Sequence, residues 1–285
     1  MNNSKGASGL KQYPAPASHT PIGVFDSGIG GLGVLRALMA ELPHERFVYL
    51  ADNAHAPYGE RGQDFVLERA RALAGRLLRE HAIKALVVAC NTATAAAVRA
   101  LRAELGQLPI VGIEPALKPA AAASRTGHIG VLATRGTLQS AKFQELLHGL
   151  GHHPARFHLR ACDGLADAIE KEAVGADCAR TAELIGEHIA ALGALGRSAG
   201  QIDTLVLGCT HYPLVWPLWQ QRVADAATLL DPAAAVARQC RRVLAERGLL
   251  HPPHLAAAPL IQWLATGSPQ TVQAAVARWV SVERL

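Results

Sequence analysis

The sequence contains no apolar run long enough to cross a bilayer, although 50% of its 285 residues are hydrophobic. A transmembrane helix needs about 20 consecutive, mostly apolar residues. The first twenty residues, MNNSKGASGLKQYPAPASHT, are polar and rich in proline, serine and alanine, and they lack the apolar centre of an export signal. We therefore predict a cytoplasmic protein with no membrane partner, in which residues 1–20 form a disordered tail.

Clustered charge and paired cysteines are missing as well. The net charge is only +5, and the basic residues form no run and no patch interleaved with aromatics. Such a patch is typical of nucleic-acid binding, so nucleic acid is not an expected partner. The five cysteines include no CxxC pair and no Cys/His spacing typical of zinc ligands. We expect neither a disulfide framework nor a metal site.

What the sequence does contain is a regular alternation of short apolar segments and longer helical patterns, from IGVFD at 22–26 to IVGI at 110–113. This alternation predicts a parallel sheet flanked by helices. The pattern restarts at HIGVLAT (128–134), which echoes PIGVFDS (21–27). We expect an α/β fold with two similar domains, each a parallel sheet flanked by helices, related by pseudo-twofold symmetry with the active site between them.

The expected domains divide the chain unevenly. Residues 21–114 form the first α/β domain, residues 115–229 form the second, and the C-terminal segment 230–285 completes the first. Within that segment, IQWLAT predicts a strand. Ser268 followed by Pro269 predicts the start of a last helix, because serine is a favoured cap and proline suits the first helical position.

Two predicted strands end in a cysteine, Cys90 in ALVVACNTAT and Cys209 in TLVLGCTHYP. Ligands of open parallel sheets collect at the carboxyl ends of strands, where helix N-termini lie. A thiol at such a helix start has a lowered pKa and can act as a base. A single cysteine at this place can also be a small apolar residue that ends a buried strand. The pairing favours function, and we interpret Cys162, Cys178 and Cys240 as structural.

A glycine motif follows the first predicted strand, where DSGIGGLG places Gly28, Gly30 and Gly33 in the spacing GxGxxG. Asp52 ends the next predicted strand, about where the acid of a dinucleotide site binds a ribose. Asp26 argues against this interpretation, because its charge would face the pyrophosphate. We therefore interpret the glycines as positions where the backbone closely approaches a small ligand.

Six motifs occur in the order FDSGIGGLGVL, YLADNAHAPYGERG, VVACNTATA, VGIEPALKPA, GVLATRGTLQS and LGCTHYPLV, between about residues 21 and 267. Together they closely resemble glutamate racemases, cofactor-independent members of the aspartate/glutamate racemase superfamily. The resemblance implies a two-domain enzyme without a cofactor that interconverts L- and D-glutamate. It also implies that the product D-glutamate is supplied for peptidoglycan synthesis and the bacterial cell wall.

The resemblance implies roles for individual residues. By similarity, Cys90 acts on D-glutamate and Cys209 on L-glutamate. The chemistry agrees, because inversion by proton transfer needs a base on one face of the α-carbon and an acid on the other. Asp26 and His211 are implied to tune or relay protons. The implied substrate-binding positions are Asp26, Ser27, Tyr58, Gly59, Asn91, Thr92, Thr210 and His211, with Thr134 and Thr137 as further candidates.

One stretch departs from the family pattern. Family members carry a glutamate after a segment that usually begins Cys-Pro, whereas ACDGLADAIE has Asp163 and Gly164 at that point. The length of the segment is kept, which places Glu170 where a proton-relay partner of His211 is expected. An exposed helix glutamate is the alternative interpretation.

Two other functions stay open at this stage. A racemase for aspartate or another amino acid would share these motifs, because side-chain specificity depends on pocket shape; the histidine in CTHYP favours glutamate by resemblance. A protein that only binds an amino acid or a nucleotide would be expected to lack one of the two cysteines, and both are present. Family members commonly form dimers, so the resemblance implies a homodimer.

Overall fold

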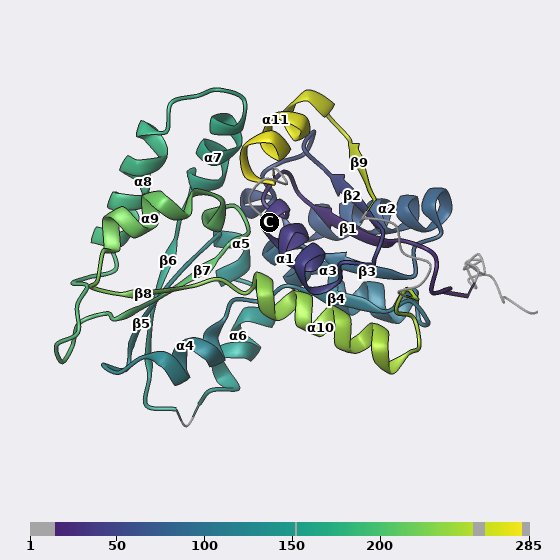
Figure 1. Cartoon of the computed structure of the whole chain (residues 1–285). Helices are drawn as coiled ribbons and strands as arrows, with labels where there is room; N and C mark the ends of the chain where they lie inside the picture. Colours follow the sequence, from purple (N-terminus) through teal and green to yellow (C-terminus); the bar gives the residue numbers. More distant parts are fainter. Residues whose placement is uncertain (1–14, 152, 253–259, 281–285) are drawn as a thin grey trace, which may run out of the picture.

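The computed structural model describes residues 15–151, 153–252 and 260–280, and it consists of two α/β bodies (Figure 1). Most of the predicted tail, residues 1–14, lies outside the described residues. Further along the predicted tail, the Ser18 carbonyl accepts a hydrogen bond from Lys84 Nζ at 2.5 Å. Among the described residues, no helix is both long and apolar enough to span a bilayer.

The first body is built on a parallel sheet of five strands in the order β4-β3-β1-β2-β9. Its central strands are buried along their whole length, as expected for a parallel sheet covered on both faces. β9 pairs with β2, so a C-terminal strand completes the sheet that the N-terminal strands begin. The bounds are β1 Ile22–Asp26, β2 Phe47–Ala51, β3 Ala85–Val88, β4 Ile110–Gly112 and β9 Ile261–Ala265.

Helices cover both faces of this sheet. One face packs against α1, α10 and α11, and the other against α2 and α3. The predicted start of the last helix is confirmed, because Ser268 Oγ accepts a hydrogen bond from Thr271 N and Pro269 is the first helical residue. The bounds are α1 Leu32–Glu41, α2 Gln63–His81, α3 Asn91–Glu104, α10 Ala233–Glu246 and α11 Pro269–Trp279, with the 3-10 helix η1 at Tyr58–Glu60.

The second body has a parallel sheet of four strands in the order β6-β5-β7-β8. Helices α7, α8 and α9 pack on one face, and α4 and α6 pack on the other. The strands are β5 His128–Ala133, β6 Arg156–Ala161, β7 Thr204–Gly208 and β8 Thr228–Leu230. The helices are α4 Leu117–Ala123, α5 Arg135–Leu138, α6 Ala141–His148, α7 Leu165–Ala173, α8 Ala179–Ala190 and α9 Trp216–Val223, with the 3-10 helix η2 at Tyr212–Val215.

The two bodies follow the same plan, which confirms the prediction of two similar α/β domains. β1 lies between β2 and β3, just as β5 lies between β6 and β7. In each domain the strand that leads to a cysteine pairs directly with the first strand of that domain. Apolar residues of both domains, such as Val24 and Leu207, belong to one buried cluster. The corresponding strand ends therefore place Cys90 and Cys209 at equivalent positions.

Candidate active site

Cys90 lies just beyond β3 as the N-cap of α3, and only 5% of its surface is exposed. Its Sγ accepts a hydrogen bond from Ala93 N at 3.4 Å and donates one to Ser27 Oγ at 3.7 Å. The sequence predicts a lowered pKa for a thiol at this helix start. For Cys90 this prediction is wrong, because burial, with a further contribution from Asp26, raises its pKa to about 12. Loss of hydration outweighs the helix amide.

Cys209 follows β7 and is equally buried, but the helix after it is the short 3-10 helix η2 rather than an α-helix. Its Sγ lies 3.7 Å from His211 Nδ1, and His211 Nε2 lies 2.6 Å from Glu170 Oε1 on α7. Burial alone would lower the pKa of His211, but the contacts with Cys209 and Glu170 outweigh burial and raise that pKa well above its usual value. Cys209, His211 and Glu170 therefore form a continuous chain of polar contacts.

Asp26, the last residue of β1, connects the two domains. Its carboxylate is fully buried, with Oδ1 accepting a hydrogen bond from Gly28 N at 2.8 Å and Oδ2 accepting one from Thr210 Oγ1 at 3.0 Å. Burial raises the pKa of Asp26, although the nearby His211 lowers it in part. Ser27 Oγ, which contacts Cys90 Sγ, also donates to Asp26 Oδ1 at 3.3 Å. Asp26 thus links the surroundings of Cys90 in the first domain to Thr210, the residue after Cys209, in the second.

Hydroxyl groups from both domains meet next to Cys90. Thr92 Oγ1 lies 2.9 Å from Thr134 Oγ1 and 3.3 Å from Thr137 Oγ1. Gly59 packs against this cluster, since a Cβ at Gly59 would lie 2.7 Å from Thr134 Cβ. Asn91 is buried, and its side-chain amide has no hydrogen-bond partner among the described residues. These hydroxyl and amide groups can bind the carboxylates and ammonium of an amino acid.

The glycines of the GxGxxG spacing allow contacts within the protein. A Cβ at Gly28 would lie 1.9 Å from Glu170 Oε1, and a Cβ at Gly30 would lie 2.5 Å from His211 Nδ1. A Cβ at Gly33 would meet nothing within 4 Å. The close approach that the sequence predicts for a small ligand is therefore made, at Gly28 and Gly30, by side chains of the second domain.

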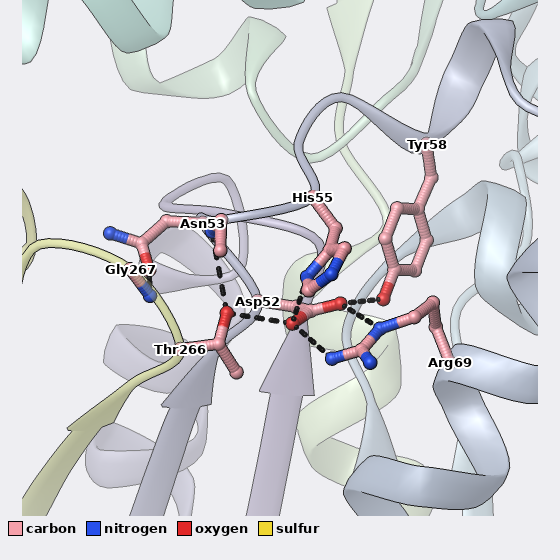
Figure 2. A network of polar contacts seen from close by, with 8 residues as sticks. Asp52, Asn53, His55, Tyr58, Arg69, Thr266 and Gly267 are labelled. Atoms are coloured by element: carbon pink, nitrogen blue, oxygen red, sulfur yellow. Dashed lines mark hydrogen bonds and ion pairs between the residues drawn. The ribbon is translucent and has the colours of Figure 1, made fainter.

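Asp52, directly after β2, has a buried carboxylate whose two oxygens already accept hydrogen bonds from protein donors (Figure 2). Arg69 donates from Nε at 2.9 Å and from Nη2 at 2.7 Å, and the hydroxyls of Tyr58 and Thr266 also donate. Burial raises the pKa of Asp52, but these donors outweigh burial and lower it. Asp52 is thus accounted for without a dinucleotide, and the Tyr58 hydroxyl points to Asp52.

One buried polar group at the site has no counterpart among the sequence predictions. Tyr49, on β2, donates a hydrogen bond from its hydroxyl to the Gly28 carbonyl at 3.0 Å. Its position inside the apolar strand FVYLA indicates only a core residue, so no local signal marks this contact. In the described part of the chain, no group of three or more His, Cys, Asp or Glu side chains is arranged to hold a metal ion.

Comparison with known proteins defines the class of this chain. Residues 33–240 match the family model described as Asp/Glu/Hydantoin racemase. The chain belongs to this family, and it is accordingly a racemase, an enzyme of the isomerase class.

The names of the individual relatives are more specific than the description of the family model, because they are all glutamate racemases. A glutamate racemase of Ectopseudomonas mendocina (strain ymp) is 50% identical over 233 residues, which cover 82% of this chain and 85% of the relative. The crystal structure of glutamate racemase isoform RacE1 from Bacillus anthracis superimposes with a TM-score of 0.79 at 33% identity, covering 92% of this chain and 94% of that chain. Escherichia coli glutamate racemase, in complex with L-glutamate and the activator UDP-MurNAc-ala, gives a TM-score of 0.77 at 29% identity, covering 91% of this chain and 95% of that one. These findings confirm the resemblance to glutamate racemases.

Proposed function

We propose that this protein is a cofactor-independent glutamate racemase that interconverts L- and D-glutamate. The observation that carries the proposal is the pair of buried thiols, Cys90 and Cys209, contributed by equivalent strand ends of the two domains. Asp26 links their surroundings, because it neighbours Ser27 on the side of Cys90 and contacts Thr210 on the side of Cys209. The Escherichia coli relative in complex with L-glutamate supports glutamate as the substrate.

The proposed reaction moves one proton at each face of the α-carbon. From L-glutamate, the Cys209 thiolate removes the α-proton, and the electron pair of the C–H bond moves onto the α-carbon and its carboxylate. The Cys90 thiol then delivers its proton to the opposite face, which yields D-glutamate and a Cys90 thiolate. From D-glutamate, the two cysteines exchange roles.

Charge inside the site explains how a buried thiol becomes a base. Burial raises the pKa of Cys90, which favours the neutral thiol when no substrate is bound. The ammonium group of a bound amino acid brings a positive charge beside the thiol, which favours the thiolate. Asp26 is placed to share the proton on the side of Cys90. His211, held by Glu170, has the matching role at Cys209.

Substrate binding in this proposal uses polar groups that the structure gathers around the thiols. The side chains of Asn91, Thr92 and Thr210 and the nearby helix amides bind the carboxylates and stabilise the developing negative charge. Ser27, Tyr58 and Gly59 complete the site. We also propose a domain division into 21–114 with 230–285 and 115–229, a homodimeric cytoplasmic enzyme, and a role in supplying D-glutamate for peptidoglycan.

The first test is proton NMR of the purified protein with L-glutamate, and separately L-aspartate, in D2O with a chelator and no added cofactor. We expect the α-proton signal and the optical activity of glutamate to decay together, while aspartate stays unchanged. Parallel decay for aspartate would instead make the enzyme an aspartate racemase. No change for either amino acid with correctly folded protein would contradict the proposed function.

The second part of this test separates the two thiols. Cys90→Ser and Cys209→Ser should each abolish net racemisation, because each removes the acid or base on one face. Cys178→Ser is the matched control, since Cys178 is an exposed free cysteine away from the site, and this variant should keep full activity. Full racemase activity in either active-site variant would disprove the two-thiol mechanism.

A further inference from the structure

Tyr49 is a buried polar residue that the proposed proton transfer does not use. Its ring is fully buried on β2 and packs against Trp263 of β9, with ring centroids 5.8 Å apart. Its hydroxyl donates to the Gly28 carbonyl at 3.0 Å. Burial, with contributions from Asp26 and Glu170, raises the pKa of Tyr49 well above its usual value, so the hydroxyl stays a donor.

The Gly28 carbonyl is one end of a peptide group whose other end is the N–H of Ile29. That N–H donates to Glu170 Oε1 across the domain boundary at 2.9 Å. Because a peptide group is planar, fixing its carbonyl also fixes the direction of its N–H. Glycine at position 28 would otherwise leave this peptide free to rotate. A hydrogen bond to the carbonyl also polarises the peptide group and strengthens its N–H as a donor.

Glu170 Oε1 accepts from two directions. Besides the Ile29 N–H, it lies 2.6 Å from His211 Nε2, and His211 Nδ1 in turn lies 3.7 Å from Cys209 Sγ. A rotation of the peptide between Gly28 and Ile29 would therefore shift Glu170 and release His211 from its present orientation. Tyr49 belongs to the first domain, but through this peptide and Glu170 it affects the surroundings of Cys209 in the second domain.

We propose that Tyr49 is a positioning residue for the proton relay of Cys209, acting through the peptide between Gly28 and Ile29 and through Glu170. The inference rests on the proposed function, because it assumes that Cys209 exchanges the α-proton of L-glutamate. Tyr49 touches neither thiol by hydrogen bond, and its effect is confined to one of the two proton-transfer steps.

The test is Tyr49→Phe, which removes only the hydroxyl and keeps the ring that packs on Trp263. We expect kcat/KM to fall about tenfold, the effect of losing one buried hydrogen bond of roughly 1.4 kcal/mol. The fall must be equal in both directions, because the two enantiomers have equal free energy. Substrate isotope effects separate the two steps.

With α-deuterated L-glutamate, the primary isotope effect on kcat/KM should rise in Tyr49→Phe, because removal of the deuteron by Cys209 becomes more rate-limiting. With α-deuterated D-glutamate it should fall toward one, because removal by Cys90 becomes less limiting. A residue with a merely structural role would change both isotope effects together or neither. Unchanged or parallel isotope effects would therefore overturn the proposal.

A double-mutant cycle gives an independent readout. In a Glu170→Ala background, Tyr49→Phe should have little further effect on kcat/KM, because its link to His211 is already gone; full additivity would overturn the proposal. Gly28→Ala should give the same opposed isotope effects, since its Cβ would displace Glu170 Oε1 directly. Their absence would equally overturn it.

Tyr212→Phe is the matched control for loss of a buried tyrosine hydroxyl, which here donates to the Cys162 carbonyl at 3.4 Å. It should lower the melting temperature without the opposed isotope effects. Wild-type activity in both directions is measured first, and an inactive wild type would refute the proposed function itself. If the wild type is active and Tyr49→Phe has the same kcat/KM and isotope effects, only the role of Tyr49 is refuted.

Discussion

Burial and hydrogen bonding act in opposite directions on the ionisable residues of the site. Burial raises the pKa of both Cys90 and Asp26, and the hydrogen-bond donors around them offset this only in part. At His211 the balance is reversed, because its contacts with Cys209 and Glu170 outweigh burial. In residues of similar exposure, burial therefore decides the pKa shift of Cys90 and Asp26, whereas the neighbouring groups decide that of His211.

At this scale we predict that Cys90 stays protonated up to about pH 9 in the free protein, because its pKa is about 12 and a thiolate forms only near that pH. Asp26→Asn should lower the pKa of Cys90, since it removes a neighbouring negative charge. Ultraviolet absorbance of the thiolate against pH measures both effects, with the matching Cys90→Ser protein subtracted. A Cys90 thiolate at neutral pH in the free wild type would contradict the prediction.

The network around Asp52 shows how elements are joined at the carboxyl ends of strands (Figure 2). Asp52 follows β2, Tyr58 begins η1, Arg69 lies on α2 and Thr266 follows β9. The segment after β2, helix α2 and the segment after β9 thus meet on one carboxylate. The segment with Tyr58 and Gly59 is held against the domain boundary by this network, because the Tyr58 hydroxyl donates to Asp52 and Gly59 packs on Thr134.

We predict that Asp52→Asn destabilises the protein by about 1–3 kcal/mol, because Arg69 and Tyr58 lose a charged acceptor. The KM for glutamate should rise more than kcat falls, since the segment with Tyr58 and Gly59 is loosened while both thiols stay in place. Thermal melting and steady-state kinetics measure the two effects. Glu104→Gln, which breaks the exposed pair of Glu104 with Arg71, is the control and should change little. An unchanged KM in Asp52→Asn would show that this network does not support the site.

Helix α7 ties the two domains together at the scale of the whole molecule. Its Glu170 accepts a hydrogen bond from Ile29 N in the first domain. Its Glu172, only 3% exposed, forms an ion pair with Arg278 of α11, which packs against α7 (Figure 1). The C-terminal helix therefore helps to set how the second domain sits on the first.

We predict that Arg278→Met destabilises the protein by about 1–3 kcal/mol, because the buried Glu172 carboxylate loses its cationic partner. The loss is limited because the Arg278 side chain is partly exposed to solvent. Combining it with Glu172→Gln should restore most of this loss, since the uncompensated charge is then removed. Thermal melting of the single and double variants measures this coupling. Strictly additive losses would show that the pair does not link the domains.

Much of the fold could be predicted because its signals are local. Alternating apolar strands and helical patterns, the echo between residues 21–27 and 128–134, and the cap at Ser268 each depend on neighbours along the chain. The order of the six motifs likewise indicated the family, and the resemblance identified Cys90, Cys209, His211 and Glu170 as candidate site residues. The similar strand orders of the two sheets agree with the predicted pair of similar domains.

The sequence by itself thus determined the two-sheet architecture, the family and the residue types at the strand ends. Only the tertiary structure decided the raised pKa of Cys90. It also decided that Gly28 and Gly30 contact side chains of the second domain, and that the Tyr49 hydroxyl donates to the Gly28 carbonyl. The physical reason is that hydration and hydrogen bonding depend on groups brought together from distant parts of the chain. The periodicity of apolar residues in the sequence indicates which side chains are buried, but not which groups they contact there.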